Sequence, residues 1–212
     1  VTQAEVLILG SLMAALAAAR SPIGLGGIVR LFDSDPYSLR EAMGELGPAV
    51  IGSALHPRVL GRALSTADIV VATSLFAPFS IAESVIEEMK RGVVIFDLTA
   101  CSGISSVFPT LRCIDLAAAS TSQEKPMSDG PRVCYINAAG AVPRTTAMAL
   151  TNELIPMLTR LVGRGSGLEN ALKIDGGLRQ GVATFRGRVV NQKIADSVGL
   201  KAIDINLLLS FS

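Results

Sequence analysis

Residues 6–33 read VLILGSLMAALAAARSPIGLGGIVRLFD, and this stretch decides the fold class. A continuous apolar run of β-forming residues, Val6–Leu9, is followed by a turn at Gly10 and an alanine-rich helical stretch. A second apolar run, Ile28–Phe32, ends at Asp33. A strand, a helix and a second strand within roughly 30 residues form a βαβ unit, in which the two strands run parallel.

Similar apolar runs recur along the chain and alternate with helix-like segments. Strands without polar alternation, joined by helices, indicate a parallel sheet that is covered on both faces. The sequence therefore predicts an α/β, Rossmann-like, doubly wound and mostly parallel sheet, with Val6–Leu9 central between Ile28–Phe32 and Ile69–Ala72. The other expected strands are residues 49–53, 93–96 and 133–136; the expected helices include residues 57–66, 81–89 and 147–161.

The pattern of predicted helices and strands changes after residue 163. A long loop is expected over Leu116–Gly130, before the last strand and the long helix. Beyond residue 163 the pattern predicts a small appendage with a helix, a hairpin turning at Arg186-Gly187, and a helix near Ile194–Val198. We expect a Rossmann-like nucleotide-binding domain over residues 1–148, and a connecting helix with a C-terminal helical and hairpin appendage over residues 149–212.

The amino-acid composition excludes some classes of binding partner. The 212 residues carry a net charge of +1 and are 17% charged, which argues against nucleic acid and against membrane phosphates. Half of the residues are hydrophobic, and the longest apolar run, Val6–Ala19, is short of the ~20 residues of a membrane helix. We expect no membrane association and a protein interface instead, in a homo- or hetero-oligomer. Three cysteines without close spacing argue against a disulfide framework and suit the cytoplasm.

The turn after the first strand has the position, but not the full sequence, of a dinucleotide-binding fingerprint. The pattern G-x-G-x-x-G here reads Gly10, Leu12 and Ala15. Leu12 places a side chain where pyrophosphate oxygens approach the backbone, so the alternative is a turn that keeps the fold without the ligand. Asp33 suits the ribose diol of NAD; the alternative is an acidic residue that caps its own turn.

A second motif lies near residue 140. Residues 133–152 read VCYINAAGAVPRTTAMALTN, a short strand, a small-residue turn and the start of a long helix. The run Asn137–Thr145, with the segments 55–75, 90–98, 185–190 and 194–200, resembles the alanine dehydrogenase and proton-translocating transhydrogenase family. The similarity covers nearly all of residues 5–200. It implies NAD as the cofactor, contacted by Gly10, Ser11, Leu12, Met13, Asp33, Leu55, Ser74, Leu75, Ala100 and Asn137.

The chain departs from the family in two respects. After the fifth strand the family has two aspartates, and here Asp97 is followed by Cys101 in the second position. Cys101 is either a nucleophile or redox centre or, as is more common for a lone cysteine, a small buried hydrophobic residue. The family's substrate-binding Arg and its catalytic Lys and His belong to an N-terminal domain without a counterpart in these residues, and the loop residue His56 does not replace them. We expect no metal-binding site.

The resemblance thus implies the NAD-binding portion of an alanine dehydrogenase-like oxidoreductase. Such an enzyme would act on an amino or imino acid, and it would be incomplete without a partner domain or subunit. The alternative is a catalytically inactive, degenerate Rossmann domain that serves as a binding or scaffold module.

Overall fold

The computed structural model describes residues 2–73, 80–100, 106–121, 132–163 and 167–210. The chain divides into two compact units, Val1–Pro143 and Arg144–Ser212. The first unit ends five residues before the boundary that the sequence suggests, because the long helix starts at Pro143 and its remaining turns belong to the second unit.

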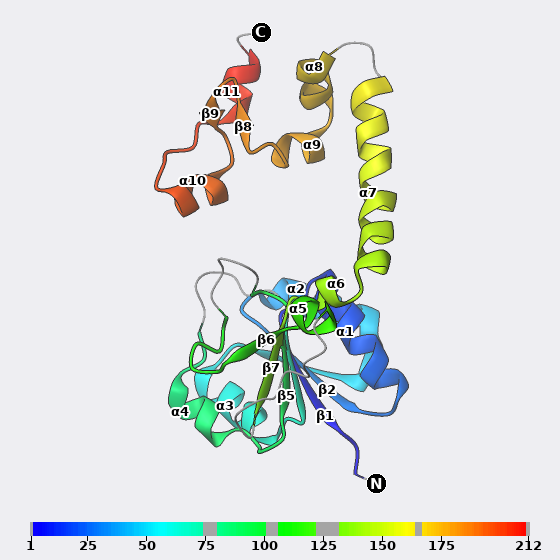
Figure 1. The fold of residues 1–212 in the computed structure, drawn as a ribbon, viewed down its shortest axis with the longest axis vertical. Helices are drawn as coiled ribbons and strands as arrows, with labels where there is room; N and C mark the ends of the chain where they lie inside the picture. Colours follow the sequence, from blue (N-terminus) through cyan, green and yellow to red (C-terminus); the bar gives the residue numbers. More distant parts are fainter. Residues whose placement is uncertain (1, 74–79, 101–105, 122–131, 164–166, 211–212) are drawn as a thin grey trace. The chain divides into compact units, whose positions relative to one another are not determined.

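Within the described residues of the first unit, seven parallel strands form one sheet in the order β3-β2-β1-β4-β5-β7-β6 (Figure 1). The position of β1 between β2 and β4 is confirmed, and with it the Rossmann-like fold class. The strands are β1 (Glu5–Leu9), β2 (Ile28–Asp33), β3 (Val50–Ala54), β4 (Ile69–Ala72), β5 (Val94–Asp97), β6 (Cys113–Asp115) and β7 (Val133–Ile136).

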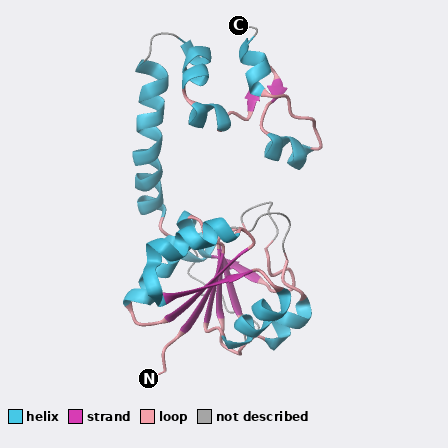
Figure 2. Cartoon of the chain, turned by 180° about the vertical axis from the view of Figure 1, so that it is seen from behind, coloured by secondary structure: helices cyan, strands magenta, loops and turns pink. Residues whose placement is uncertain are grey.

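Helices lie on both faces of this sheet (Figure 2). The described helices of this unit are α1 (Met13–Gly24), α2 (Pro36–Leu46), α3 (Pro57–Thr66), α4 (Glu83–Glu88), α5 (Leu116–Thr121) and α6 (Ala138–Ala141), with a short 3₁₀ turn η1 (Gly47–Ala49). Along β1 the side chains alternate between two cores: Val6 and Ile8 pack with residues of α1 and α2, while Leu7 and Leu9 pack with residues of α3 and α4. Both faces are buried, which is why the strand is apolar at every position.

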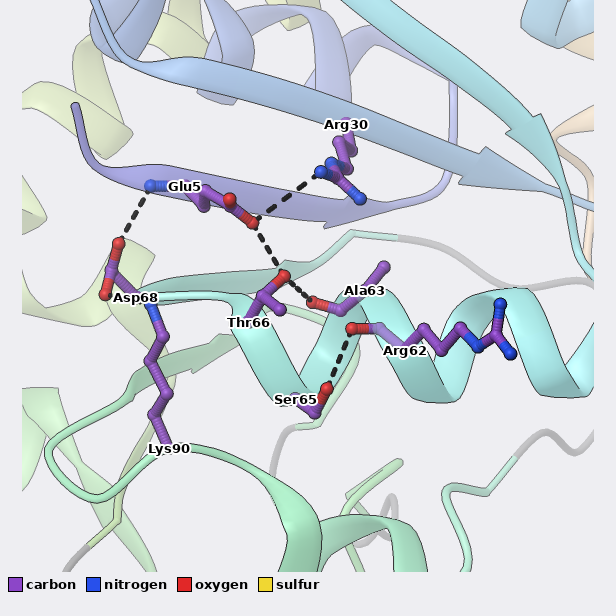
Figure 3. A network of polar contacts seen from close by, with 8 residues as sticks. All are labelled: Glu5, Arg30, Arg62, Ala63, Ser65, Thr66, Asp68 and Lys90. Atoms are coloured by element: carbon purple, nitrogen blue, oxygen red, sulfur yellow. Dashed lines mark hydrogen bonds and ion pairs between the residues drawn. The ribbon is translucent and has the colours of Figure 1, made fainter. Parts of the chain in front are cut away.

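A polar network lies at the amino ends of the strands (Figure 3). The Glu5 carboxylate accepts a hydrogen bond of 2.7 Å from the Thr66 hydroxyl and forms an ion pair of 3.8 Å with Arg30. The Glu5 amide donates to Asp68, which also pairs with Lys90 at 2.8 Å. These partly exposed groups connect β1, β2, α3 and the loop before β5. They lie at the opposite end of the strands from the candidate site.

The second unit has a small core of its own, in which Leu172, Phe185, Ile205 and Leu209 are buried. The expected hairpin is confirmed, since β8 and β9 pair antiparallel and Arg186 and Gly187 both have positive φ, 49° and 75°, as a type I′ turn requires. The elements are α7 (Pro143–Gly163), α8 (Gly167–Ile174), α9 (Gly176–Gln180), β8 (Thr184–Phe185), β9 (Arg188–Val189), α10 (Gln192–Val198) and α11 (Ile205–Ser210).

The expected loop over Leu116–Gly130 is wrong in its first part. Leu116–Thr121 forms α5, because the Asp115 carboxylate accepts hydrogen bonds from the Ala117 and Ala118 amides and so caps the start of the helix. Residues 122–130 lie outside the described residues. The sequence reading also missed β6, whose three residues are too few for a recognisable pattern, and α11, where the apolar tail forms a helix.

Candidate functional site

The candidate site lies at the carboxyl ends of the strands, where the strand order reverses. From β1 the chain passes to β2 and β3 on one side, and to β4 and β5 on the other. Because every strand of this sheet is parallel, the residues that follow β1, β2, β3, β5 and β7 meet at one edge. In open α/β sheets, ligands bind outside the carboxyl ends at such a reversal.

The turn after β1 leads into the amino end of α1. Gly10 has a φ of 112°, a conformation that favours glycine, and its amide donates to the Phe32 carbonyl at 2.8 Å. Leu12 is the N-cap residue of α1, no side chain caps the helix there, and its first turn carries no acidic residue. The first amides of a helix carry partial positive charge and attract anions. The Leu12 and Met13 side chains are 44% and 80% exposed at this point.

Asp33 lies at the end of β2, directly beside this turn. Its carboxylate is 2% exposed and accepts a hydrogen bond of 2.6 Å from the Ser11 hydroxyl. The other carboxylate oxygen accepts from the Asp35 amide at 2.9 Å, so the turn-capping role is real. An ionised carboxylate has about four lone-pair sites, so both contacts leave acceptor capacity. Asp35 caps α2 through Tyr37 and Ser38, as the sequence predicts.

Leu55 follows β3, and its amide donates to the Asp33 carbonyl at 3.0 Å. Beside it lies an apolar cavity of about 220 Å³ between the amino ends of α3 and α4. Leu55, which lines this cavity, is thus hydrogen-bonded to the backbone of Asp33. Its lining residues are Leu55, Pro57, Leu60, Gly61, Ser80, Ile81, Ala82 and Val85.

Asp97, at the end of β5, organises the loop that carries Ala100. Its side chain is completely buried, and it accepts five hydrogen bonds of 2.6–3.2 Å. The donors are the Thr99 amide and hydroxyl, the Ala100 amide, the Ser106 hydroxyl and the Val107 amide. This completely buried carboxylate holds together the loop segments of Thr99–Ala100 and Ser106–Val107.

Asn137 follows β7 and adopts the left-handed conformation, with φ 57° and ψ 42°. Its side-chain amide donates to both oxygens of Asp115 at 3.2 and 3.3 Å, which leaves the amide carbonyl as an acceptor. The Ala118 amide, together with Asn137 and the Ala117 amide, holds the pKa of Asp115 below its usual value. Gly140 is required here, because a Cβ would lie 2.5 Å from that of Ala117 and 2.9 Å from the Asn137 oxygen.

The structure brings most of the expected residues to one edge of the sheet: Gly10, Ser11, Leu12, Met13, Asp33, Leu55, Ala100 and Asn137 all follow or end strands there. Three others, Ser74, Leu75 and Cys101, lie outside the described residues. Sequence reasoning missed Ser106 and Asp115, which fix the Asp97 loop and the Asn137 amide. An Asp at the end of a short apolar run, Cys113–Asp115, is the one signal that could have indicated Asp115.

No group of three or more His, Cys, Asp or Glu side chains in the described ranges is placed to hold a metal ion. Among the described helices, none is both long and apolar enough to cross a bilayer.

These features define the class of the first unit as a Rossmann-like dinucleotide-binding domain. Residues 1–192 match the family described as "Alanine dehydrogenase/PNT, C-terminal domain", and the chain belongs to that family. An alanine dehydrogenase of Mycolicibacterium smegmatis is 30% identical over 210 residues, which are 96% of this chain and 54% of that protein. One of Bacillus subtilis is 27% identical over 96% of this chain and 53% of its own length.

Solved structures agree. An L-alanine dehydrogenase superposes with a TM-score of 0.70 at 25% identity, over 94% of this chain and 54% of its own. A transhydrogenase from Sinorhizobium meliloti shares the fold, with a TM-score of 0.64 at 21% identity over 90% of this chain and 53% of its own. The chain thus spans about half the length of the relatives it matches.

Proposed function

We propose that this chain is the NAD-binding portion of an alanine dehydrogenase-like oxidoreductase that acts on an amino or imino acid. The observation that carries the proposal is the adjacency of two nucleotide-recognition features. Ser11, immediately before the uncapped start of α1, donates a hydrogen bond of 2.6 Å to Asp33 at the end of β2. A dinucleotide needs an anion site and a diol acceptor side by side, and the strand reversal supplies that arrangement. Family membership supports NAD as the cofactor.

Each part of NAD has a matching group at the sheet edge. The pyrophosphate would lie at the amino end of α1, where the backbone amides favour negative charge. The adenosine ribose would donate to Asp33, and the attached adenine would reach Leu55 and the apolar cavity beside it. The nicotinamide would lie near the loop of Ala100 and near Asn137, whose carbonyl oxygen is left as an acceptor by the contact with Asp115.

When bound, NAD supplies the acceptor or donor for a hydride. The residues of this chain bind and orient it: the α1 amides neutralise charge, Asp33 fixes the ribose, and Asn137 is held by Asp115 on the nicotinamide side. None of the described residues at this edge is an obvious catalytic base, since the Asp97 carboxylate already accepts five hydrogen bonds. The substrate-binding groups would come from a further domain or a partner subunit, consistent with relatives about twice as long.

Leu12 provides the first test. The chain should bind NAD weakly in a calorimetric titration, and Leu12→Gly should tighten binding roughly tenfold, about 1.4 kcal/mol. Glycine lets the pyrophosphate approach the backbone, and it is an accepted N-cap residue, so α1 should persist. Leu25→Gly, at the other end of α1 and 88% exposed, is the matched control and should leave the affinity unchanged.

Unchanged or weaker binding by the Leu12 variant would reject the proposed pyrophosphate position. If neither protein binds NAD or NADH, the scaffold alternative is favoured. One detail of the turn supports that alternative: the Leu12 side chain stands at the start of the helix.

The long helix provides a second prediction, about association. Helix α7 exposes Met148, Leu150, Leu154, Ile155, Met157, Leu158 and Val162. Contiguous apolar surface beyond a few hundred Å² marks interaction sites. We expect a homodimer or a tight heteromer in light scattering at micromolar concentration. The double change Leu150→Arg and Leu154→Arg should shift the mass toward the monomer, whereas Leu25→Arg, an exposed position of the first unit, should not. A well-behaved monomer of the unchanged chain would contradict this expectation.

A further inference from the structure

Two cysteines that are far apart in the sequence lie side by side in the sheet. Cys113 on β6 and Cys134 on β7 are register partners on adjacent parallel strands. Their sulfur atoms are 2.7 Å apart, and neither cysteine is in a disulfide. Because the two cysteines are 21 positions apart in the chain, their spacing gave no indication of this pairing.

The backbone already has the geometry of a bridge. Neighbouring strands are about 4.8 Å apart, and disulfides join residues whose Cα atoms are about 4.4–6.8 Å apart. Both side chains lie on the same side of the sheet, because they are partners in register and their sulfurs touch. A bond between them therefore needs rotation of side chains and no shift of either strand.

The two thiols differ in character. Cys134 is completely buried, whereas Cys113 is partly exposed and can meet a small oxidant. The Cys134 thiol hydrogen-bonds to the Cys113 sulfur and lowers the pKa of Cys113 to about 7, assisted by Ser106 and opposed by burial and by the Asp97 charge. The same contact, with burial, raises the pKa of Cys134. Cys113 is thus the nucleophile of the pair, and Cys134 is placed to resolve it.

We propose that Cys113 and Cys134 form a redox-active dithiol, which a peroxide converts to a disulfide between β6 and β7. The Cys113 thiolate attacks an oxygen of hydrogen peroxide; the O–O bond breaks, Cys113 becomes a sulfenic acid, and the departing hydroxide takes up the proton that the Cys113 thiol had lost and leaves as one water. The Cys134 sulfur then attacks the Cys113 sulfur. The S–S bond forms, the S–O bond breaks, and the hydroxyl leaves with the Cys134 proton as a second water. The dithiol loses two electrons, and the peroxide gains them.

The proposal stands independently of NAD binding. The bond would form two residues before Asp115 and three residues before Asn137, on the strands that carry this hydrogen-bonded pair. An external dithiol such as dithiothreitol would reverse it by exchange.

Oxidation of the chain with one equivalent of hydrogen peroxide tests the proposal. Cys101→Ser leaves Cys113 and Cys134 as the only thiols, since the sequence has three cysteines. The expected product is a chain that has lost both thiols and two hydrogen masses without gaining oxygen. Peptide mapping should join the segments of Cys113 and Cys134, with no intermolecular link on a non-reducing gel, and dithiothreitol should restore both thiols. Mapping of the unchanged chain gives the same readout if the Cys101 variant does not fold.

Three outcomes would overturn the proposal: a disulfide between two chains, stable oxygen adducts on Cys113 with Cys134 still a thiol, or two intact thiols after a reference monothiol is consumed. Cys134→Ala in the same background is the matched control. It should retain a sulfenic acid that a dimedone probe captures. Its Cys113 should also react with iodoacetamide only at higher pH than in the parent, because the hydrogen bond that lowers its pKa is gone.

Discussion

Asp97→Ala should destabilise the nucleotide-binding unit by roughly 4 kcal/mol, a large share of the stability of an ordinary domain. The carboxylate is completely buried and receives five hydrogen bonds, three of them from backbone amides. Alanine leaves those donors without an acceptor, and a buried donor that loses its partner costs about 1–3 kcal/mol. Chemical denaturation followed by far-UV circular dichroism suits this chain, which has no tryptophan.

Two further variants serve as comparisons for Asp97→Ala. Asp97→Asn keeps the shape and one acceptor oxygen but turns an amide toward other donors, so its midpoint should fall between those of the unchanged chain and the alanine variant. Glu88→Ala removes an exposed carboxylate at the end of α4 and should move the midpoint little. If Asp97→Ala shifts the midpoint no more than Glu88→Ala, Asp97 does not organise the loop.

Asp33→Ala should weaken NAD binding by roughly 10- to 100-fold. Hydrogen bonds to a charged acceptor contribute about 1.5–3 kcal/mol each, and tenfold in affinity is about 1.4 kcal/mol. Titration calorimetry with NAD measures the loss. Titration with the 2′-phosphorylated dinucleotide distinguishes loss of ribose recognition from general damage to the site. The Asp33 carboxylate repels the 2′-phosphate, so Asp33→Ala should not weaken binding of this dinucleotide as it weakens binding of NAD.

Ser11→Ala is the comparison variant for Asp33. It removes the internal 2.6 Å contact to the carboxylate but keeps the carboxylate itself, so the affinity for NAD should fall less than in Asp33→Ala. An Asp33 variant that binds both dinucleotides equally poorly would show that Asp33 only supports its turn through the Asp35 amide. An Asp33 variant that binds NAD as well as the unchanged chain would remove it from the site.

The agreement between sequence and structure is greatest where a residue's surroundings are local. The α2 start is an example: Asp35 and Pro36 are adjacent, and the cap needs only the next three residues. The Arg186-Gly187 turn is another, because its backbone conformation depends on two residues. β6 was missed because its three residues gain their stability from β7, a strand that begins 18 positions later in the chain.

The sequence by itself determined the βαβ order, the apolar strands of a sheet covered on both faces, and the family, because these depend on patterns along the chain. Only the tertiary structure decided which polar groups meet. Ser11 and Asp33 are 22 positions apart, as are Asp115 and Asn137, and Cys113 and Cys134 are 21 apart. The first two contacts exist because parallel pairing brings the carboxyl ends of different strands to one edge, and the cysteines meet because β6 and β7 pair in register. Strand register is a property of the assembled sheet rather than of either strand.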